Sequence, residues 1–126
     1  MQSVLVTGGA GFIGSHLCDL LIDKGYKVIC LDNLLTGSKK NIDHLLGDSN
    51  FKFLEEDVCK TTPHTLDAID HIFHLASPAS PIDYQNYPEE TLLTNSMGTI
   101  NVLKLSKETG AKVLVASTSE IYGDPL

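Results

Sequence analysis

Three glycines early in the chain, Gly8, Gly11 and Gly14, recur at every third residue. They stand between a short apolar run and a helical pattern, the context in which this spacing indicates a dinucleotide-binding turn. The first glycine lets the chain turn sharply, the second lets a pyrophosphate approach the backbone, and the third lets the helix pack closely. The N-terminus of that helix offers unpaired N–H groups and a partial positive charge. The turn therefore predicts a phosphate site, the alternative being a tight turn without a ligand.

Asp32 stands at the end of the next apolar run, at about the distance from the glycines where such sites carry an acidic residue. Its carboxylate can accept hydrogen bonds from both ribose hydroxyls of an adenosine, and it would repel a 2′-phosphate. Asn33 follows, and not an arginine that would accommodate this phosphate. The sequence therefore predicts NAD rather than NADP as the cofactor. The alternative for Asp32 is a turn residue after a strand.

The composition is that of a globular domain. The 126 residues carry a formal net charge of -7, and 42% of them are hydrophobic. An acidic surface argues against nucleic acid and anionic membranes as partners, because both require clustered Lys and Arg. No apolar run approaches the ~20 residues of a membrane span, and no signal-peptide pattern precedes the first apolar run. We therefore expect a cytoplasmic protein whose three cysteines, Cys18, Cys30 and Cys59, are buried free thiols.

Apolar runs of strand length alternate with helical patterns along the chain. The expected strands cover residues 3–6, 27–31, 51–54, 71–75 and 112–116. The expected helices cover residues 12–24, 38–46 and 88–109. Residues 62–68 are expected to form a loop or a helical turn, and residues 77–88 a loop. Strict alternation predicts right-handed β-α-β units and a parallel sheet covered on both faces. We therefore expect one α/β domain over residues 1–126, a Rossmann-type doubly wound parallel sheet truncated after the fifth strand.

The periodicity of the helical segments predicts which side chains are buried. The expected core residues are Ile13, Leu17, Leu20 and Leu21 in the first helix, Ile42, Leu45 and Leu46 in the second, and Leu93, Met97, Ile100 and Leu103 in the last. Among the histidines, His71 and His74 lie an odd number of residues apart on a strand, so they face opposite sides and cannot share a metal. His16 is expected to be a packing residue, and His44 and His64 are expected at the surface. No metal site is predicted.

The glycine turn, which reads Thr-Gly-Gly-Ala-Gly-Phe-Ile-Gly from Thr7, resembles that of the extended short-chain dehydrogenase/reductase family. Further segments also resemble motifs of that family. They are the loop at residues 32–37, the pair at 57–58, the helical pattern at 94–99 and the segment at 117–123. The resemblance covers essentially the whole chain. It implies an enzyme that uses bound NAD on a nucleotide sugar.

The run His-Leu-Ala-Ser-Pro-Ala-Ser-Pro, from His74 to Pro81, is similar to that of UDP-glucuronate decarboxylases within this family. The similarity implies oxidation of UDP-glucuronate at C4, loss of CO₂ from the β-keto acid, and reduction to UDP-xylose with NAD as hydride carrier. Two alternatives stay open. One is a UDP-sugar 4-epimerase or nucleotide-sugar 4,6-dehydratase, because Leu93 stands where animal decarboxylases carry a basic residue. The other is a non-catalytic NAD-binding module.

The resemblance also implies which residues form the site. Those that it assigns to the cofactor are Gly8, Gly11, Phe12, Ile13, Gly14, Asp32, Asn33, Leu35, Thr36, Asp57, Val58, Leu75, Ser77, Thr94 and Ala116. It assigns catalysis to Thr118 at the C4 oxygen, to Glu120 in proton transfer or orientation of the carboxylate, and to Ser119 in holding the substrate. Asn101 is assigned to the substrate. The alternatives are strand-end capping for Thr118 and Ser119 and a solvated carboxylate for Glu120.

The acid/base pair of this family, a Tyr followed four residues later by a Lys, does not occur in the chain. The residues four positions after Tyr26, Tyr84, Tyr87 and Tyr122 are Cys30, Pro88, Thr91 and Leu126. Relatives carry this pair further along their chains, and they pair the long fourth helix across a two-fold axis. The resemblance therefore implies an N-terminal fragment that is inactive alone and whose parent enzyme is a homodimer.

Overall fold

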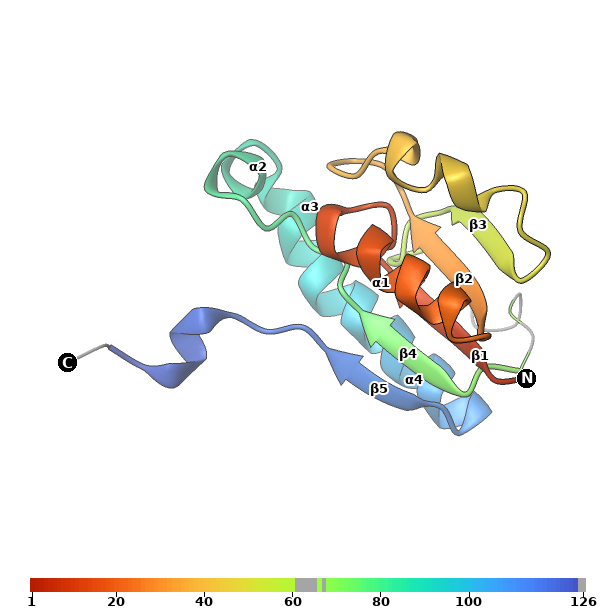
Figure 1. The fold of residues 1–126 in the computed structure, drawn as a ribbon. Coiled ribbons are helices and arrows are strands. Elements are labelled where there is room, and N and C mark those ends of the chain that lie inside the picture. Colours follow the sequence, from red (N-terminus) through yellow and green to blue (C-terminus); the bar gives the residue numbers. More distant parts are fainter. Residues whose placement is uncertain (61–65, 67, 125–126) are drawn as a thin grey trace.

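The computed structural model describes residues 1–60, 66 and 68–124, and its centre is a five-stranded parallel sheet (Figure 1). The strands are β1 (Ser3–Thr7), β2 (Lys27–Asp32), β3 (Phe51–Glu55), β4 (His71–His74) and β5 (Lys112–Val115). Their order across the sheet is β3-β2-β1-β4-β5, and every neighbouring pair is parallel. The winding direction therefore reverses between β1 and β4, as in Rossmann-type folds. This arrangement confirms the predicted fold class.

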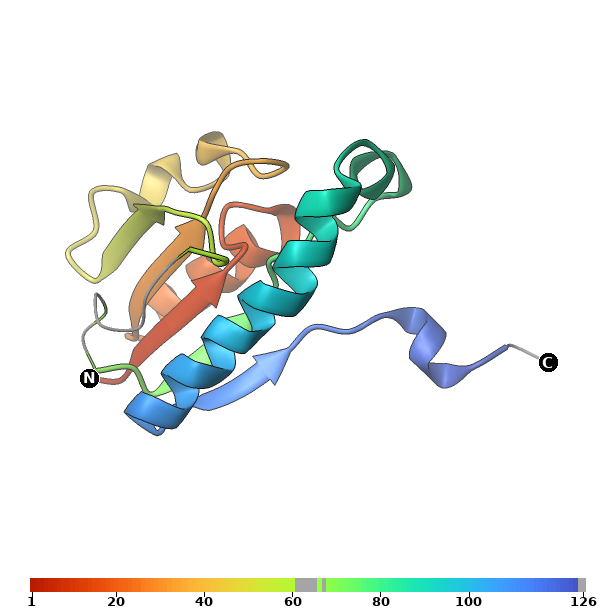
Figure 2. The same ribbon diagram turned by 180° about the vertical axis from the view of Figure 1, so that it is seen from behind.

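Helices cover both faces of the sheet. One face carries α1 (Phe12–Asp23), and the other carries a long helix, as the two opposite views show (Figures 1 and 2). The long helix consists of α3 (Pro88–Leu93), a π-helical segment (Thr94–Gly98) and α4 (Thr99–Thr109) in direct succession. The remaining short helices of the described residues are α2 (Pro81–Asn86) and three 3₁₀ turns at Lys39–Asn41, Asp43–Leu45 and Ser119–Tyr122.

The central strand β1 separates two apolar clusters, because its side chains alternate between the faces of the sheet. Val4 and Val6 belong to the cluster that α1 covers, and Leu5 belongs to the one that α4 covers. All three are at most 2% exposed. Burial on both faces explains why the strand reads as an uninterrupted apolar run.

The prediction for the core face of α1 is wrong for two of its four residues. Ile13 and Leu20 are 71% and 50% exposed, whereas Leu21 is buried and Leu17 packs partly against the core. The buried residues of the helix are Gly14, Ser15, Cys18 and Leu21. Small side chains on this stripe let the helix approach the sheet, so the buried face does not coincide with the largest apolar residues.

The predicted core stripe of the long helix is also wrong. Its members are exposed from 43% to 51%, and they are Leu93, Met97, Ile100 and Leu103. The helix instead buries Thr94, Gly98, Val102 and Leu105. At Gly98 the helix lies so close to its neighbours that an added Cβ would be 2.7 Å from Val58 Cγ1. The small residue Gly98 permits this contact, and the four apolar side chains of the predicted stripe are exposed instead.

Three local predictions also change. Residues 38–46 form two 3₁₀ turns rather than one helix, and Leu46 is 42% exposed. Residues 77–88 contain α2, where the Ser80 hydroxyl accepts a hydrogen bond from the Asp83 N–H at 3.1 Å. His16 is exposed, and its ring meets Phe12 edge-on with centroids 5.1 Å apart. The predicted loop at 62–68, like His64, lies largely outside the described residues.

All three cysteines are free thiols. Cys18 and Cys30 are buried as predicted, whereas Cys59 is half-buried. A hydrogen bond with Cys18, together with burial, raises the pKa of Cys30 well above its ordinary value. Cys30 is therefore an unreactive core residue. Among the described residues, no helix is long and apolar enough to cross a membrane.

Candidate functional site

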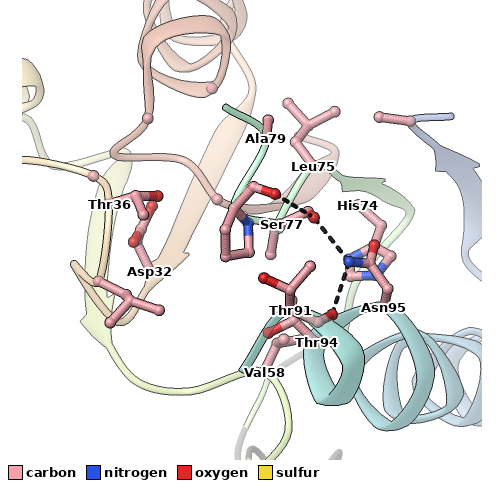
Figure 3. A pocket seen from close by; sticks show the side chains of 18 of the residues that line it. Asp32, Thr36, Val58, His74, Leu75, Ser77, Ala79, Thr91, Thr94 and Asn95 are labelled. Carbon is pink, nitrogen blue, oxygen red and sulfur yellow. Dashed lines mark hydrogen bonds between the residues drawn. The ribbon is translucent and has the colours of Figure 1, made fainter. Parts of the chain in front are cut away.

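A cavity of about 890 Å³ lies at the carboxyl end of the sheet (Figure 3). Its walls come from the segments that follow all five strands and from the stretch of the long helix between Thr91 and Thr99. Open α/β sheets bind ligands at this edge, beside the strand where the winding direction reverses. The volume lies within the ordinary range of small-molecule and cofactor sites.

The glycine turn forms the floor of this cavity between β1 and α1. Gly8 has a positive φ of 72°, and an added Cβ would lie 2.8 Å from the Ala76 nitrogen, so no larger residue fits there. At Gly14 an added Cβ would overlap the Gly8 carbonyl. No side chain caps the N-terminus of α1, where Gly11 is the N-cap residue. The backbone of the first helical turn therefore faces the cavity with its N–H groups available to an anion.

Asp32 stands beside this turn and is 8% exposed. Its Oδ2 accepts a hydrogen bond from the Ala10 N–H at 3.0 Å, and its Oδ1 accepts one from the Leu34 N–H at 2.8 Å. These bonds fix the orientation of the carboxylate, and each oxygen keeps a further lone pair. The turn role and the ligand role of Asp32, which the sequence left as alternatives, are therefore compatible with each other.

The loop after β2 is tied to the glycine turn through Ala10. The carbonyl of Ala10 accepts hydrogen bonds from the Ser38 N–H at 3.0 Å and from Asn41 Nδ2 at 2.9 Å. Asn33, in the same loop, accepts a hydrogen bond from the Leu35 N–H at 3.1 Å. Asn41 had not been singled out from the sequence, because its partner lies 31 positions away.

The wall after β3 is formed by Asp57 and Val58. Asp57 Oδ1 accepts a hydrogen bond from the Cys59 N–H at 2.9 Å, and Val58 is 6% exposed. Asn101, predicted to contact the substrate, does not line this cavity. Its Nδ2 donates at 3.0 Å to the carbonyls of both Val58 and Cys59. In this structure Asn101 therefore supports the wall from behind and does not line the cavity.

His74 ends β4 inside this site and is 4% exposed. Its Nδ1 lies 2.7 Å from the Thr7 hydroxyl oxygen, and its Nε2 lies 3.0 Å from the Thr99 hydroxyl oxygen. Burial lowers the pKa of His74, so the ring is neutral near pH 7. His71 is half-buried, three residues earlier on the strand, and among the described residues no cluster of His, Cys, Asp and Glu could hold a metal ion.

Of the residues predicted to be catalytic in the segment after β5, only one lines the cavity. Ala116 and Thr118 line the cavity, whereas Ser119 and Glu120 do not. The Thr118 hydroxyl accepts a hydrogen bond from the Glu120 N–H at 3.4 Å at the start of a 3₁₀ turn. This is the capping role that the sequence left open for Thr118. Glu120 and Ser119 are exposed in this chain.

Every residue that the sequence assigns to a cofactor lines this one cavity. The polar residues that line it without having been assigned a role are Glu56, His74, Ser80, Asp83, Tyr84, Thr91, Asn95, Thr99 and Ser117. Three of these lie on the long helix, at positions 91, 95 and 99, and Figure 3 labels Thr91 and Asn95. Their spacing of four residues along the helix was the signal that could have found them.

The formally charged side chains among the described residues that line the cavity are all acidic. Four carboxylates line it, those of Asp32, Glu56, Asp57 and Asp83, and none of the described lining residues is Lys or Arg. An anionic group would therefore be held by backbone N–H groups of the glycine turn rather than by cationic side chains. The residues present fit a dinucleotide with one pyrophosphate, and they disfavour a ligand with a further phosphate near Asp32.

The fold and the cavity define a Rossmann-type domain of the short-chain dehydrogenase/reductase kind. The sequence model of the NAD dependent epimerase/dehydratase family matches residues 4–126. The chain belongs to this family, which confirms the resemblance found in the sequence.

Relatives with established names extend the comparison. UDP-glucuronic acid decarboxylase 1 of Danio rerio is 51% identical over 124 residues, which are 98% of this chain and 29% of that protein. The protein of the same name in Arabidopsis thaliana is 51% identical over 123 residues, or 98% of this chain and 28% of that protein. The chain thus spans less than a third of the length of these relatives.

Solved structures show the same fold. The UDP-N-acetylglucosamine 4-epimerase of Methanobrevibacter ruminantium M1, in complex with UDP-N-acetylmuramic acid, has a TM-score of 0.86 and 33% identity over 98% of this chain and 40% of that one. The UDP-glucose 4-epimerase of Brucella ovis, in complex with NAD, has a TM-score of 0.81 and 30% identity over 100% of this chain and 38% of that one.

Proposed function

We propose that the cavity at the carboxyl end of the sheet binds NAD. The observation that carries this proposal is that one cavity brings together the glycine turn, Asp32 and every other residue predicted to contact the cofactor. The glycine turn would hold the pyrophosphate, and Asp32 the adenosine ribose. Val58 would contact the adenine, and Leu75 and Ser77 the nicotinamide end. When bound, NAD supplies hydride transfer at a carbon that carries a hydroxyl or a carbonyl.

Titration of the chain with NAD in a calorimeter tests this proposal. Binding with one site per chain is expected, together with weaker binding of NADP, because Asp32 would repel a 2′-phosphate. Absence of NAD binding by a folded chain would refute the proposal. Equal affinity for both dinucleotides would refute the role given to Asp32.

We further propose that the parent enzyme decarboxylates UDP-glucuronate to UDP-xylose through a C4-keto intermediate. The proposal is supported by 51% identity to proteins named UDP-glucuronic acid decarboxylase over nearly the whole chain. Thr118 lines the cavity, and its hydroxyl can donate to and accept from the C4 oxygen of a sugar. Ser119 and Glu120 would reach the substrate only if the segment after β5 were turned toward the cavity in the whole enzyme.

A UDP-sugar 4-epimerase is the second candidate for the parent enzyme. It is favoured by the solved structures, several of which are named as 4-epimerases of UDP-sugars, with up to 34% identity in the archaeal and bacterial examples. Release of labelled CO₂ from carboxyl-labelled UDP-glucuronate by the full-length enzyme separates the two candidates. Interconversion of UDP-sugars without CO₂ release would favour the epimerase. We expect the 126-residue chain alone to release none.

We also propose that the parent enzyme is a homodimer that pairs through the long helix. The outward face of this helix carries five exposed apolar side chains, which are Leu92, Leu93, Met97, Ile100 and Leu103. Exposed apolar patches of this kind mark interaction surfaces. Light scattering of the full-length enzyme should give a dimer that Ile100→Glu dissociates, and Ile82→Glu, an exposed position outside this helix, should leave it intact. A strict monomer at high concentration would refute the proposal.

A further inference from the structure

A circuit of hydrogen bonds surrounds the loop at residues 76–78, which follows β4 and lines the cavity; Figure 3 shows the part of it at Ser77 and Asn95. It begins at the Ala76 N–H, which lies 3.3 Å from Thr7 Oγ1. From there it runs through His74, with 2.7 Å to Thr7 and 3.0 Å to Thr99. The circuit thus crosses from β1 to the long helix through one imidazole ring.

The second half of the circuit returns to the same loop. Thr99 Oγ1 donates to the backbone carbonyl of Asn95 at 3.1 Å, and the side chain of the same residue donates from Nδ2 to Ser77 Oγ at 2.8 Å. Ser77 Oγ in turn donates to the Pro78 carbonyl at 3.2 Å. The circuit therefore starts at Ala76 and ends at Pro78, so the loop is held from both sides.

The donors and acceptors of this circuit leave a single consistent assignment of protons. The Asn95 carbonyl can only accept, so the Thr99 hydroxyl uses its proton there and must accept from His74 Nε2. Nδ1 then has no proton and accepts from the Thr7 hydroxyl, whose oxygen accepts from Ala76. A neutral ring with its proton on Nε2 satisfies every bond. The lowered pKa of His74 is consistent with this state.

We propose that His74 is a positioning residue for the cofactor site, acting as a neutral Nε2–H imidazole that orders the loop at residues 76–78. The inference rests on the proposed binding of NAD, because this loop would face the nicotinamide end. Ser77 uses its proton on Pro78 and one lone pair on Asn95. Its remaining lone pair therefore presents a hydrogen-bond acceptor to the cavity, suited to a ribose hydroxyl or a carboxamide N–H.

The protonation state of the ring can be measured without any ligand. Long-range ¹H–¹⁵N correlation spectra of the labelled chain near pH 7 report which ring nitrogen carries the proton. We expect Nε2 to be protonated and Nδ1 to be bare. A ring protonated on Nδ1, or on both nitrogens, would overturn the proposal whether or not NAD binds, so this readout is independent of the proposed function.

The positioning effect is tested by cutting the circuit at Thr99. Thr99→Val keeps the shape but removes the hydroxyl, and with it the acceptor for His74 Nε2 and the donor to the Asn95 backbone carbonyl. We expect it to weaken NAD binding about tenfold. Thr99→Ser keeps the hydroxyl and should bind within about twofold of wild type. Ser96→Ala is the matched control, because Ser96 makes the same kind of bond, to the Leu92 carbonyl at 2.6 Å, outside the cavity.

The outcomes separate the two proposals. If the wild-type chain is folded and does not bind NAD, the proposed function fails. The spectrum of His74 alone then tests whether the ring has the protonation state that the hydrogen-bond circuit requires. If the wild type binds NAD and Thr99→Val binds equally well, the positioning role is refuted. If Thr99→Ser loses as much affinity as Thr99→Val, the effect belongs to packing of the methyl group and the positioning role is again refuted.

Discussion

Asp32 holds two backbone N–H groups and also borders the proposed cofactor, so a mutation must separate these effects. Asp32→Asn keeps one carbonyl oxygen as an acceptor but removes the charge. We expect NAD affinity to fall about tenfold to a hundredfold, because hydrogen bonds to charged groups are worth about 1.5–3 kcal/mol. Calorimetric titration measures the loss.

Asp48→Asn is the matched control for this change. Asp48 makes the same kind of turn, accepting a hydrogen bond from the Asn50 N–H at 2.7 Å, but it does not line the cavity. It should leave NAD affinity unchanged. An equal loss in both variants would show that the carboxylate acts on the fold rather than on the ligand.

His74 gives the chain a predictable response to acid. Its folded pKa lies below the ordinary value of 6.5, because burial disfavours the charged ring. Stability is therefore complete above about pH 6.5, and it decreases as the pH falls, because the unfolded chain takes up a proton that the folded ring does not. The loss can reach about 1.4 kcal/mol for each pH unit between the two pKa values.

Urea unfolding of wild type and His74→Asn between about pH 7.5 and about pH 5.5 isolates this contribution. The variant retains an acceptor for Thr7 but has no titrating ring. We expect the difference in the free energy of unfolding between the two proteins to shrink toward acid pH. A constant difference across this range would contradict the assignment of the lowered pKa to His74.

Strands that are buried on both faces were predicted well from the sequence. The buried face of a helix, which packs with one side only, was predicted less well. The expected strand at residues 27–31 is β2 (Lys27–Asp32), because a parallel strand buried on both sides is an uninterrupted apolar run. A helix offers several apolar stripes, and periodicity does not say which one packs. In the long helix Gly98 and Val102 are buried, whereas Met97 and Ile100 are exposed.

The π-helical segment is a feature that no periodicity of the sequence indicated. It spans Thr94–Gly98, and the helix lines the cavity on both sides of it, from Thr91 to Thr99. A wider turn changes the angle between residues before and after it, so a face defined by 3.6 residues per turn does not continue through it. Such turns are frequent at functional sites, which agrees with its place in the cavity wall.

Gly98 allows a direct test of the close contact between this helix and the wall after β3. Gly98→Ala would place a Cβ 2.7 Å from Val58 Cγ1, so the helix or Val58 must move. We expect the free energy of unfolding to fall by about 1–3 kcal/mol, as overpacking commonly costs. Gly47→Ala is the control, because nothing lies within 4 Å of its added Cβ. Equal stability of both variants in urea unfolding would contradict the close contact.

Across the whole molecule, the sequence predicted those parts of the site that one local segment supplies. The glycine turn and Asp32 carry their signal in a short stretch, so their joint position in the cavity followed from the order of the strands. His74 and Asn41 act through partners in distant segments, at Thr99 and Ala10. Such pairs arise only when the elements are packed, so no single stretch of sequence reveals them.

The charge of the whole molecule argues for a last prediction, on the choice between NAD and NADP. The chain has a net charge of -7, and carboxylates are the only formally charged groups among the described residues that line the cavity. NADP carries a further phosphate of about −1.5 to −2 charge, which these carboxylates repel. Salt screens such repulsion, since the Debye length falls from about 30 Å at 0.01 M to about 3 Å at 1 M.

The ratio of the two dissociation constants, Kd for NADP over Kd for NAD, should therefore fall severalfold when NaCl is raised from about 0.01 M to about 1 M. Calorimetry in both buffers measures the ratio, which cancels effects of salt on the fold. Affinity for NAD itself should not fall, because its pyrophosphate would be held by backbone N–H groups and not by exchangeable ion pairs with Lys or Arg. A ratio that does not change with salt would mean that NADP is excluded by the shape of the loop after β2 and not by charge.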